Sequence, residues 1–358
     1  MTFVVMQKYV NLSRLMAVVA FSAIGLGSCG NISSPSVAQT QPANKTFGDW
    51  CRTKASLSAE AKHTVEVLLK EAETTDCDVA NQKLSSLTEL NLSENEISDI
   101  KPLQSLTNLT KLLVHKNQIS DIKPLQSLTN LTNLGLSDNL ISDIQPLKSL
   151  TKLIQLGLYN NKISDITPLK NLTKLTDIGL DNNQISDITP LQSLTNLTGF
   201  SLSNNKISDI KPLQSLTKLT NFLLNNNQIS DIKPLQSLTQ LTSIGLGNNK
   251  ISDIKPLQSL TQLEWLDLSG NQISDIKPLQ SLTKVTALIL RNNQISDIKP
   301  LQSLTQLQWL ELNDNKISDI KPLQSLTKLM LFHIGGNPIS PKICPIKPES
   351  TCDWAHWN

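Results

Sequence analysis

The side chains best suited to molecular recognition gather near the C-terminal end of the chain, at related positions of a repeating sequence. Trp265 and Asp267 recur as Trp309 and Glu311, and Arg291 lies between the two pairs. Trp and Arg are the residues most enriched among interface hot spots. We therefore predict a site for a protein partner, with both indole rings substantially exposed and about 10 Å apart at the spacing of every second strand. The predicted site comprises Trp265, Asp267, Ile289, Arg291, Trp309, Glu311 and His333.

Two alternatives remain open for this group of residues. An aromatic pair flanked by acids can also grip a sugar, with the rings stacked on its apolar faces and the carboxylates bonded to its hydroxyls, so glycan binding is the alternative function. Drift among recently duplicated repeats would also leave scattered aromatic residues without a role. A second, weaker patch is predicted further toward the N-terminus and comprises Lys111, His115, Gln155 and Tyr159.

The sequence does not favour catalysis. The four histidines are His63, His115, His333 and His356, and none accompanies a nucleophile or a metal-binding pattern. Asp267 and Glu311 could be imagined as a catalytic carboxylate pair, but they would lie two strands apart on an open surface that excludes little water. We predict that the chain is not an enzyme and needs no cofactor.

The elements that must position these side chains follow from one repeat. Twelve asparagines, from Asn95 to Asn337, recur at an unbroken spacing of 22 residues. A fixed period in this range is typical of a solenoid, in which each unit buries its apolar side against its neighbours. In the first unit Leu90 and Leu92 alternate as in a strand, and the apolar residues from Ile97 onward then recur at spacings of three. Each unit is therefore predicted to be a strand followed by a tight return segment.

Two residues of the repeat have predictable backbone roles. The side-chain amide of the repeated Asn has donors and an acceptor, which suit a ladder of hydrogen bonds between the turns of adjacent units. Proline follows seven residues after the Asn in eleven units, from Pro102 to Pro322. Proline can open one helical turn and disfavours a long helix, so short 3-10 or turn segments are expected on the convex side.

The repeat, LxxLxLxxNxISDIxPLxxLTxL, resembles the 22-residue leucine-rich repeat of the bacterial internalin-like class over residues 84–340. The resemblance implies an α/β fold: a right-handed, curved leucine-rich repeat solenoid of about 12 repeats with a parallel β-sheet on its concave face. It also implies a non-catalytic protein-binding module, and host adhesion is conceivable. The fold alone does not identify the partner, because this architecture serves many of them.

The N-terminal segment reads as an export signal. Residues 1–28 contain Lys8 and Arg14, no acidic residue, and an apolar run too short to span a membrane. The run ends in Leu-Gly-Ser-Cys29, which resembles a bacterial lipoprotein cleavage box and predicts lipidation of Cys29; an ordinary secretory signal with a chance cysteine is the alternative. We expect an exported, lipid-anchored envelope protein, on the outer membrane or cell surface more than the inner membrane. Residues 29–46 would form a flexible tether.

The other four cysteines predict two local disulfides and two caps. Cys51–Cys77 would close an N-terminal cap at residues 47–83, which contains one amphipathic helix around Val65 and Leu68, and Cys344–Cys352 would close a C-terminal cap at 341–358. Free buried thiols and other connectivities remain alternatives. A metal site is disfavoured, because no Cys-x-x-Cys or clustered histidines accompany these cysteines.

The charge of the chain excludes one class of partner. Lys8 and Arg14 are the only charged residues of the signal, so its removal leaves 30 basic against 30 acidic side chains. This balance argues against nucleic acid. Eleven aspartates, from Asp99 to Asp319, form one column, and a lysine follows two residues later in eight units. We read this column as a solvated, self-compensated edge; divalent-cation binding, best placed at Asp165 and Asp187, is the alternative. The protein is expected to be monomeric.

Overall fold

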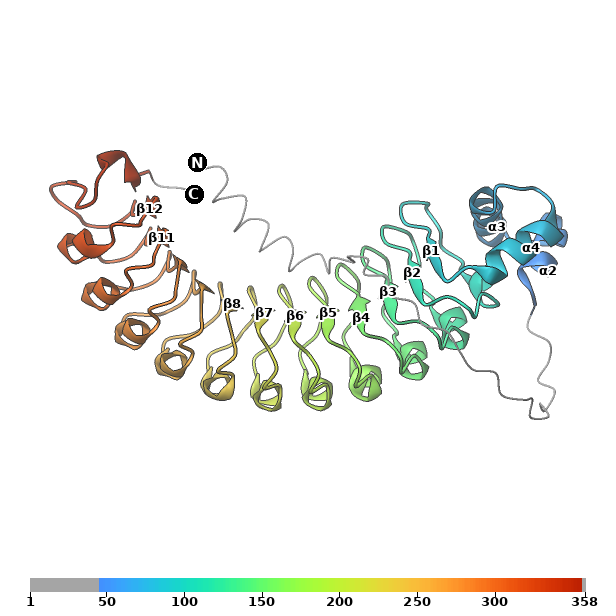
Figure 1. Cartoon of the computed structure of the whole chain (residues 1–358), viewed down its shortest axis with the longest axis horizontal. Coiled ribbons are helices and arrows are strands. Elements are labelled where there is room, and N and C mark those ends of the chain that lie inside the picture. The colour runs from blue at the N-terminus through green and yellow to red at the C-terminus, as the bar shows by residue number, and fades with distance from the viewer. Residues whose placement is uncertain (1–44, 356–358) are drawn as a thin grey trace, which may run out of the picture.

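The computed structural model describes residues 45–355, which form a curved solenoid (Figure 1). One strand from each repeat joins a single parallel sheet of thirteen strands, and the strands follow one another in chain order without a crossover. The strands line the inner side of the arc, and one short helical turn per unit lies on its outer side (Figure 1). The solenoid, the parallel sheet and the short convex turns predicted from the repeat are confirmed.

Each repeat strand is three residues long, and its middle residue is a buried core position. Adjacent strands pair exactly one repeat apart, as Leu112 pairs with Leu134. The strands are β1 Glu89–Asn91, β2 Lys111–Leu113, β3 Asn133–Gly135, β4 Gln155–Gly157, β5 Asp177–Gly179, β6 Gly199–Ser201, β7 Asn221–Leu223, β8 Ser243–Gly245, β9 Trp265–Asp267, β10 Ala287–Ile289, β11 Trp309–Glu311, β12 Leu331–His333 and β13 Cys352–Asp353.

The convex segments are 3-10 helices that begin with the repeated proline in their first turn, as the sequence predicted. Proline fits there because the first N–H groups of a helix have no partner within it. The helices are η2 Lys101–Leu103, η3 Lys123–Ser127, η4 Gln145–Ser149, η5 Thr167–Asn171, η6 Thr189–Ser193, η7 Lys211–Ser215, η8 Lys233–Ser237, η9 Lys255–Ser259, η10 Lys277–Ser281, η11 Lys299–Ser303 and η12 Lys321–Ser325.

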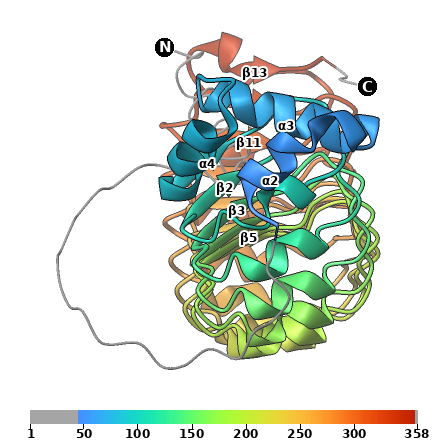
Figure 2. The ribbon, with the colours of Figure 1, turned by 90° about the vertical axis from the view of Figure 1, so that its right-hand side faces the viewer.

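The core is one continuous apolar cluster that runs from Phe47 in the N-terminal cap to Cys352 in the C-terminal cap. The repeated leucines and isoleucines of the strands, turns and 3-10 helices are almost completely buried along its whole length. Seen along the stack, the same outline recurs unit after unit (Figure 2). No single unit could bury this surface, so stability depends on the interfaces between units.

The asparagine ladder has the geometry that the sequence predicted. The Asn139 amide nitrogen donates to the carbonyls of Val114, Leu136 and Ser137 at 3.0 to 3.1 Å. Its amide oxygen accepts the N–H of Ile119 in the preceding unit at 3.0 Å. The amide thus satisfies turn backbone groups of two units at once, which a charged or apolar residue could not do.

The aspartates of the convex column have a structural role that the sequence did not reveal. Asp187 Oδ1 accepts the backbone N–H of Thr189 at 2.8 Å, where η6 begins, and Asp165 does the same for Thr167. These contacts lower the pKa of both carboxyls, through hydrogen bonds from the threonine side chain first and from its N–H second. Within residues 45–355, no group of three or more His, Cys, Asp or Glu residues is placed to hold a metal ion.

The N-terminal cap has more helix than the sequence predicted. The expected helix is α3, Ala59–Glu71, and two others flank it: α2, Phe47–Arg52, and α4, Cys77–Ser86, with the 3-10 helix η1, Lys54–Ser56, after α2. Cys51 and Cys77 form the expected disulfide between α2 and α4.

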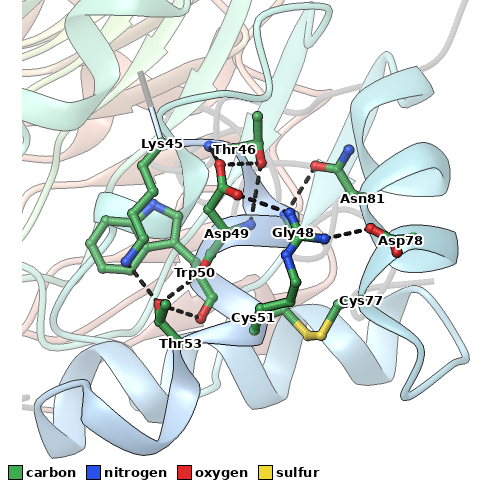
Figure 3. Close-up of polar contacts among 11 residues, drawn as sticks. Lys45, Thr46, Gly48, Asp49, Trp50, Cys51, Thr53, Cys77, Asp78 and Asn81 are labelled. Carbon is green, nitrogen blue, oxygen red and sulfur yellow. Dashed lines mark hydrogen bonds and ion pairs between the residues drawn. A yellow bond between two sulfur atoms is a disulfide. The ribbon is translucent and has the colours of Figure 1, made fainter. Parts of the chain in front are cut away.

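A polar network reinforces this disulfide (Figure 3). Arg52 pairs with Asp49 at 2.8 Å and with Asp78 at 2.5 Å. Thr46 caps α2 by hydrogen bonds with Asp49, and these bonds, together with Arg52, lower the pKa of Asp49 to about 2. Lys45 lies 4.1 Å from the centre of the Trp50 ring. The cap therefore fastens its helices with contacts among its own residues.

The cap closes the first repeat by a second set of bonds. His63 Nε2 lies 2.6 Å from the carbonyl oxygen of Asn95, and the Thr64 hydroxyl donates to the carbonyl of Asp99 at 2.7 Å. Both side chains come from α3, which covers carbonyls that a preceding repeat would otherwise meet. The repeat stack therefore begins under a helix.

The C-terminal cap ends the stack with a strand that the sequence did not indicate. Cys344 and Cys352 form the second expected disulfide. The short helix η13, Glu349–Thr351, leads into β13, which pairs with β12 through Phe332 and His333. The last repeat strand thus has a partner on both sides.

Several predictions fall on parts of the chain outside the described residues. These are the export signal at 1–28, lipidation of Cys29, nearly all of the tether at 29–46, and His356. Among residues 45–355, no helix is long and apolar enough to cross a membrane.

Candidate partner-binding site on the concave face

The predicted recognition residues come together on strands β9 to β12. Trp265 and Trp309 both pair with Ala287, one on each side of β10, so the two tryptophans occupy equivalent positions two strands apart. Asp267, Ile289, Glu311 and His333 form the adjacent row of outward-facing positions. The structure therefore brings the predicted group together on one surface.

The predicted exposure of the tryptophans is wrong. Trp265 is 6% exposed and Trp309 is 9% exposed. Both belong to an apolar cluster on the concave side of the sheet, which we call the concave cluster: Leu223, Trp265, Ala287, Ile289 and Trp309, with Leu331 packed against it. Small residues such as Ala287 lie between the rings, so the rings pack against neighbouring strands and not into solvent.

Hydrogen bonding also holds Trp309 in place. Its Nε1 donates to Glu311 Oε1 at 3.1 Å, on the same strand. A buried indole needs such a partner for its N–H. The tryptophans therefore form a preordered apolar floor that is nearly closed to solvent, and Arg291 is the most exposed of the predicted site residues.

Two carboxylates, Asp267 and Glu311, border this floor, where burial limits the contact of their charged form with water. Asp267 Oδ1 accepts the N–H and hydroxyl of Ser269 at 2.9 and 2.7 Å. Burial raises the pKa of Asp267, although Ser269 and Arg291 oppose the shift. Burial likewise raises the pKa of Glu311, against the opposing charge of Arg291. Both groups are therefore held where ionisation is costly.

Arg291 is the exposed cation of the site. Its side chain is 51% exposed, and its Nε lies 3.6 Å from Glu311 Oε2. His333 Nδ1 lies 3.9 Å from the other oxygen of Glu311. Glu311 thus stands between an exposed arginine and a mostly buried histidine.

The residues of the weaker patch lie on β2 to β4 and just beyond them, but their contacts are mostly structural. Lys111 pairs with Glu89 at 3.3 Å, and Gln155 accepts a hydrogen bond from Asn133 at 2.5 Å. The His115 ring covers Gly135, where a Cβ atom would lie 2.1 Å from its Nε2.

Burial of the two rings in this patch shifts their acid–base behaviour. It lowers the pKa of His115 and raises that of Tyr159. Both shifts disfavour the charged form of the side chain. The His115 ring packs onto Gly135, and both rings are partly buried, so they present few groups to a partner.

Sequence reasoning missed two features of this face. Asp181 is buried, accepts hydrogen bonds from the Ser201 hydroxyl and the Ser203 N–H, and has its pKa raised by burial. Its signal was an acid in an outward column otherwise rich in Ser, Asn and Gly. The second is a cleft of about 550 Å³ between β12 and the C-terminal cap, which includes Met330 and Asp353.

The repeats match a known protein family. The family model described as Leucine Rich repeats (2 copies) matches residues 85–127, 107–149, 129–171, 151–193, 173–215, 217–259 and 261–303. No curated protein matches the chain.

Solved structures match over most of the chain. An internalin, InlF, from Listeria monocytogenes has 37% identity and a TM-score of 0.72, with 82% of this chain and 95% of the internalin covered. Internalin C2 of the same organism has 34% identity and a TM-score of 0.53, with coverage of 58% and 91%. A leucine-rich repeat protein of Leptospira interrogans, at 21% identity and a TM-score of 0.63, shares the fold over 88% of this chain and 99% of its own.

Proposed function

We propose that this chain, which belongs to the internalin-like leucine-rich repeat family, is a non-catalytic module that recognises a protein partner on the concave face of its solenoid. The observation that carries this proposal is the distribution of differences between units. Core, turn and convex positions repeat almost unchanged, whereas the outward positions of the strands differ from unit to unit. Positions that the fold leaves open are those available for recognition.

The C-terminal third of this face is the best candidate for the contact. It combines the concave cluster with Arg291, Asp267, Glu311 and His333. Carboxylates whose pKa is raised by desolvation are typical of functional sites, because an ionised group there costs free energy. Their position on rigid strands also limits the entropy lost on binding.

The proposed role does not include a reaction. Asp267 and Glu311 lie on β9 and β11, with Ile289 of β10 between them. Ser269 bonds one carboxylate and Trp309 bonds the other, so both acids have local structural partners. The glycan hypothesis loses its main support, because it required exposed rings and both rings are buried.

We further propose that the protein is exported and anchored in the cell envelope through Cys29. Two disulfides in the described part of the chain support an oxidising compartment. Mass spectrometry of the mature protein tests the anchor. A lipid-modified Cys29 at the new N-terminus is expected, and an unmodified cysteine or cleavage elsewhere would remove this part of the proposal.

Crosslinking capture from an envelope extract of the source organism tests the binding role. Arg291→Glu is the informative variant because Arg291 is exposed, whereas Trp309→Ala would also damage packing. Lys299→Glu is the matched control, since Lys299 carries the same charge on the convex side of the same repeat and is exposed. A protein captured equally by the unmodified chain and the control, but to a different extent by Arg291→Glu, supports the concave site; capture is lost for an acidic partner and increased for a basic one. Equal capture by all three would place the partner elsewhere.

A further inference from the structure

We propose that the partner presents basic side chains beside apolar ones, because the concave face between β9 and β13 is an apolar floor bordered by a row of carboxylates. This inference rests on the proposed function and specifies the chemistry of its partner. The partner is a polypeptide segment with at least two lysine or arginine residues and adjacent aliphatic or aromatic residues.

Strand register arranges the site as two parallel rows. The apolar row follows the first strand position: Trp265, Ala287, Trp309 and Leu331. The acidic row follows the position two residues later: Asp267, Ile289, Glu311, His333 and Asp353. A segment lying across the strands would meet the acidic row together with Leu331 and the ring edges of the apolar row, since Trp265 and Trp309 are only 6% and 9% exposed.

The acidic row has a regular spacing. Its three carboxylates lie on β9, β11 and β13, that is, on every second strand. At the usual distance between strands, neighbouring carboxylates are therefore about 10 Å apart. One basic residue could not reach all three, so more than one cation is needed to match the row.

The balance of charge in the two rows is negative. Against Asp267, Glu311 and Asp353, the rows and their flanking outward positions carry Arg291 and the titratable His333, and Asp353 also accepts the N–H of Ala355. This arginine contacts Glu311 at 3.6 Å and remains half exposed, so it neutralises the site incompletely. Burial raises the pKa of Asp267 and of Glu311, so their ionised forms are costly there. A bound cation would stabilise both ionised groups where water is partly excluded.

The cleft at the C-terminal cap extends the site. It lies between Met330, Leu331 and His333 on one side and Pro348 and Asp353 on the other, with a volume of about 550 Å³. Met330 is 38% exposed at its edge, and Leu331 continues the apolar floor into it. The cleft thus repeats the pairing of apolar surface with a carboxylate and has room for a large side chain.

The N-terminal part of the concave face lacks this combination. Lys111 is already paired with Glu89, and glycines occupy the middle outward position of β3 to β5. No group of apolar side chains like the concave cluster is found there within the described residues. The contrast places the basic, amphipathic partner on the C-terminal third.

Selection of a random peptide library displayed on phage, against the full chain, tests this inference. Enriched sequences are expected to carry lysine or arginine next to leucine, isoleucine or an aromatic residue. The double variant Asp267→Asn/Glu311→Gln should weaken binding of the enriched peptides at least about tenfold, and rising salt should weaken it further. The matched control, Asp275→Asn/Asp297→Asn, removes the same charge from the exposed convex column and should bind as the unmodified chain does.

The outcomes separate this inference from the proposed function. Enriched peptides that are acidic or uncharged, or that bind the Asp267→Asn/Glu311→Gln variant unchanged, overturn the inference; if Arg291→Glu still abolishes their binding, the concave site stands. Peptides whose binding is weakened only by the convex control, Asp275→Asn/Asp297→Asn, overturn both this inference and the proposed concave site. A selection that enriches no peptide counts against the basic segment, while the crosslinking capture still decides the concave site. Circular dichroism spectra of all variants exclude loss of fold as the cause.

Discussion

Carboxylates on the two faces of the solenoid lie in opposite environments. Those of the convex column are exposed to solvent, and those of the concave face are largely removed from it. Asp187 is exposed and accepts hydrogen bonds from Thr189, which lower its pKa. Asp267 and Glu311 lie against apolar side chains, and burial raises their pKa. The convex carboxylates begin a helical turn in eleven units, whereas the concave ones lie where ionisation is unfavourable.

This difference identifies which positions serve the fold and which are available for function. A residue that stabilises each unit in the same way recurs from unit to unit, as the convex aspartates do in eleven of the twelve units. A residue that makes its own unit less stable persists in spite of folding, and such residues are candidates for recognition. The following predictions test this distinction, from the largest expected effect to the smallest.

Trp309→Ala should lower the free energy of unfolding by about 3 kcal/mol, because the ring is buried and its loss leaves a cavity above the sheet. Urea unfolding followed by circular dichroism measures the change. Trp309→Phe is the control and should cost less, since it keeps most of the apolar volume. If Trp309→Ala is as stable as the unmodified chain, the ring does not pack as described and the concave cluster contributes nothing to folding.

Glu311→Gln should act in the opposite direction and raise the free energy of unfolding by about 1 kcal/mol at neutral pH. The amide oxygen can still accept the hydrogen bond from Trp309, while the cost of a buried charge is removed. The same urea experiment applies. A destabilised variant would mean that the ion pair with Arg291 outweighs desolvation, and the contrast between the two faces would then fail at this residue.

Asp187→Ala should lower the free energy of unfolding by up to about 1 kcal/mol, since it removes the hydrogen-bond acceptor where η6 begins. Asp187→Asn keeps an acceptor at the same place and should cost less. The comparison of the two variants isolates the hydrogen bond from the charge. Equal losses for both would show that the charge, and not the cap, is what the convex column provides.

The pH dependence should differ in sign between the two faces. The folded pKa of Glu311 is raised, so the unmodified chain loses stability relative to Glu311→Gln as pH rises above the unfolded value of about 4.3, and the two converge below it. The folded pKa of Asp187 is lowered, so its contribution is present above about pH 4 and is lost as pH falls below that. Thermal melts of the unmodified chain, Glu311→Gln and Asp187→Ala across this pH range measure both trends. Trends of the same sign at Glu311 and Asp187 would contradict the comparison.

The sequence by itself determined the solenoid, the strand and turn of each unit and the asparagine ladder. These follow from the 22-residue period, because identical units must stack in register and each repeated position then has one environment. It also located the recognition residues on neighbouring strands. Only the tertiary structure decided how those residues lie: the burial of Trp265 and Trp309, the raised pKa values of Asp267 and Glu311, and the extra strand β13. These depend on which unlike side chains meet across neighbouring units and at the two ends, where the repeat no longer fixes the environment.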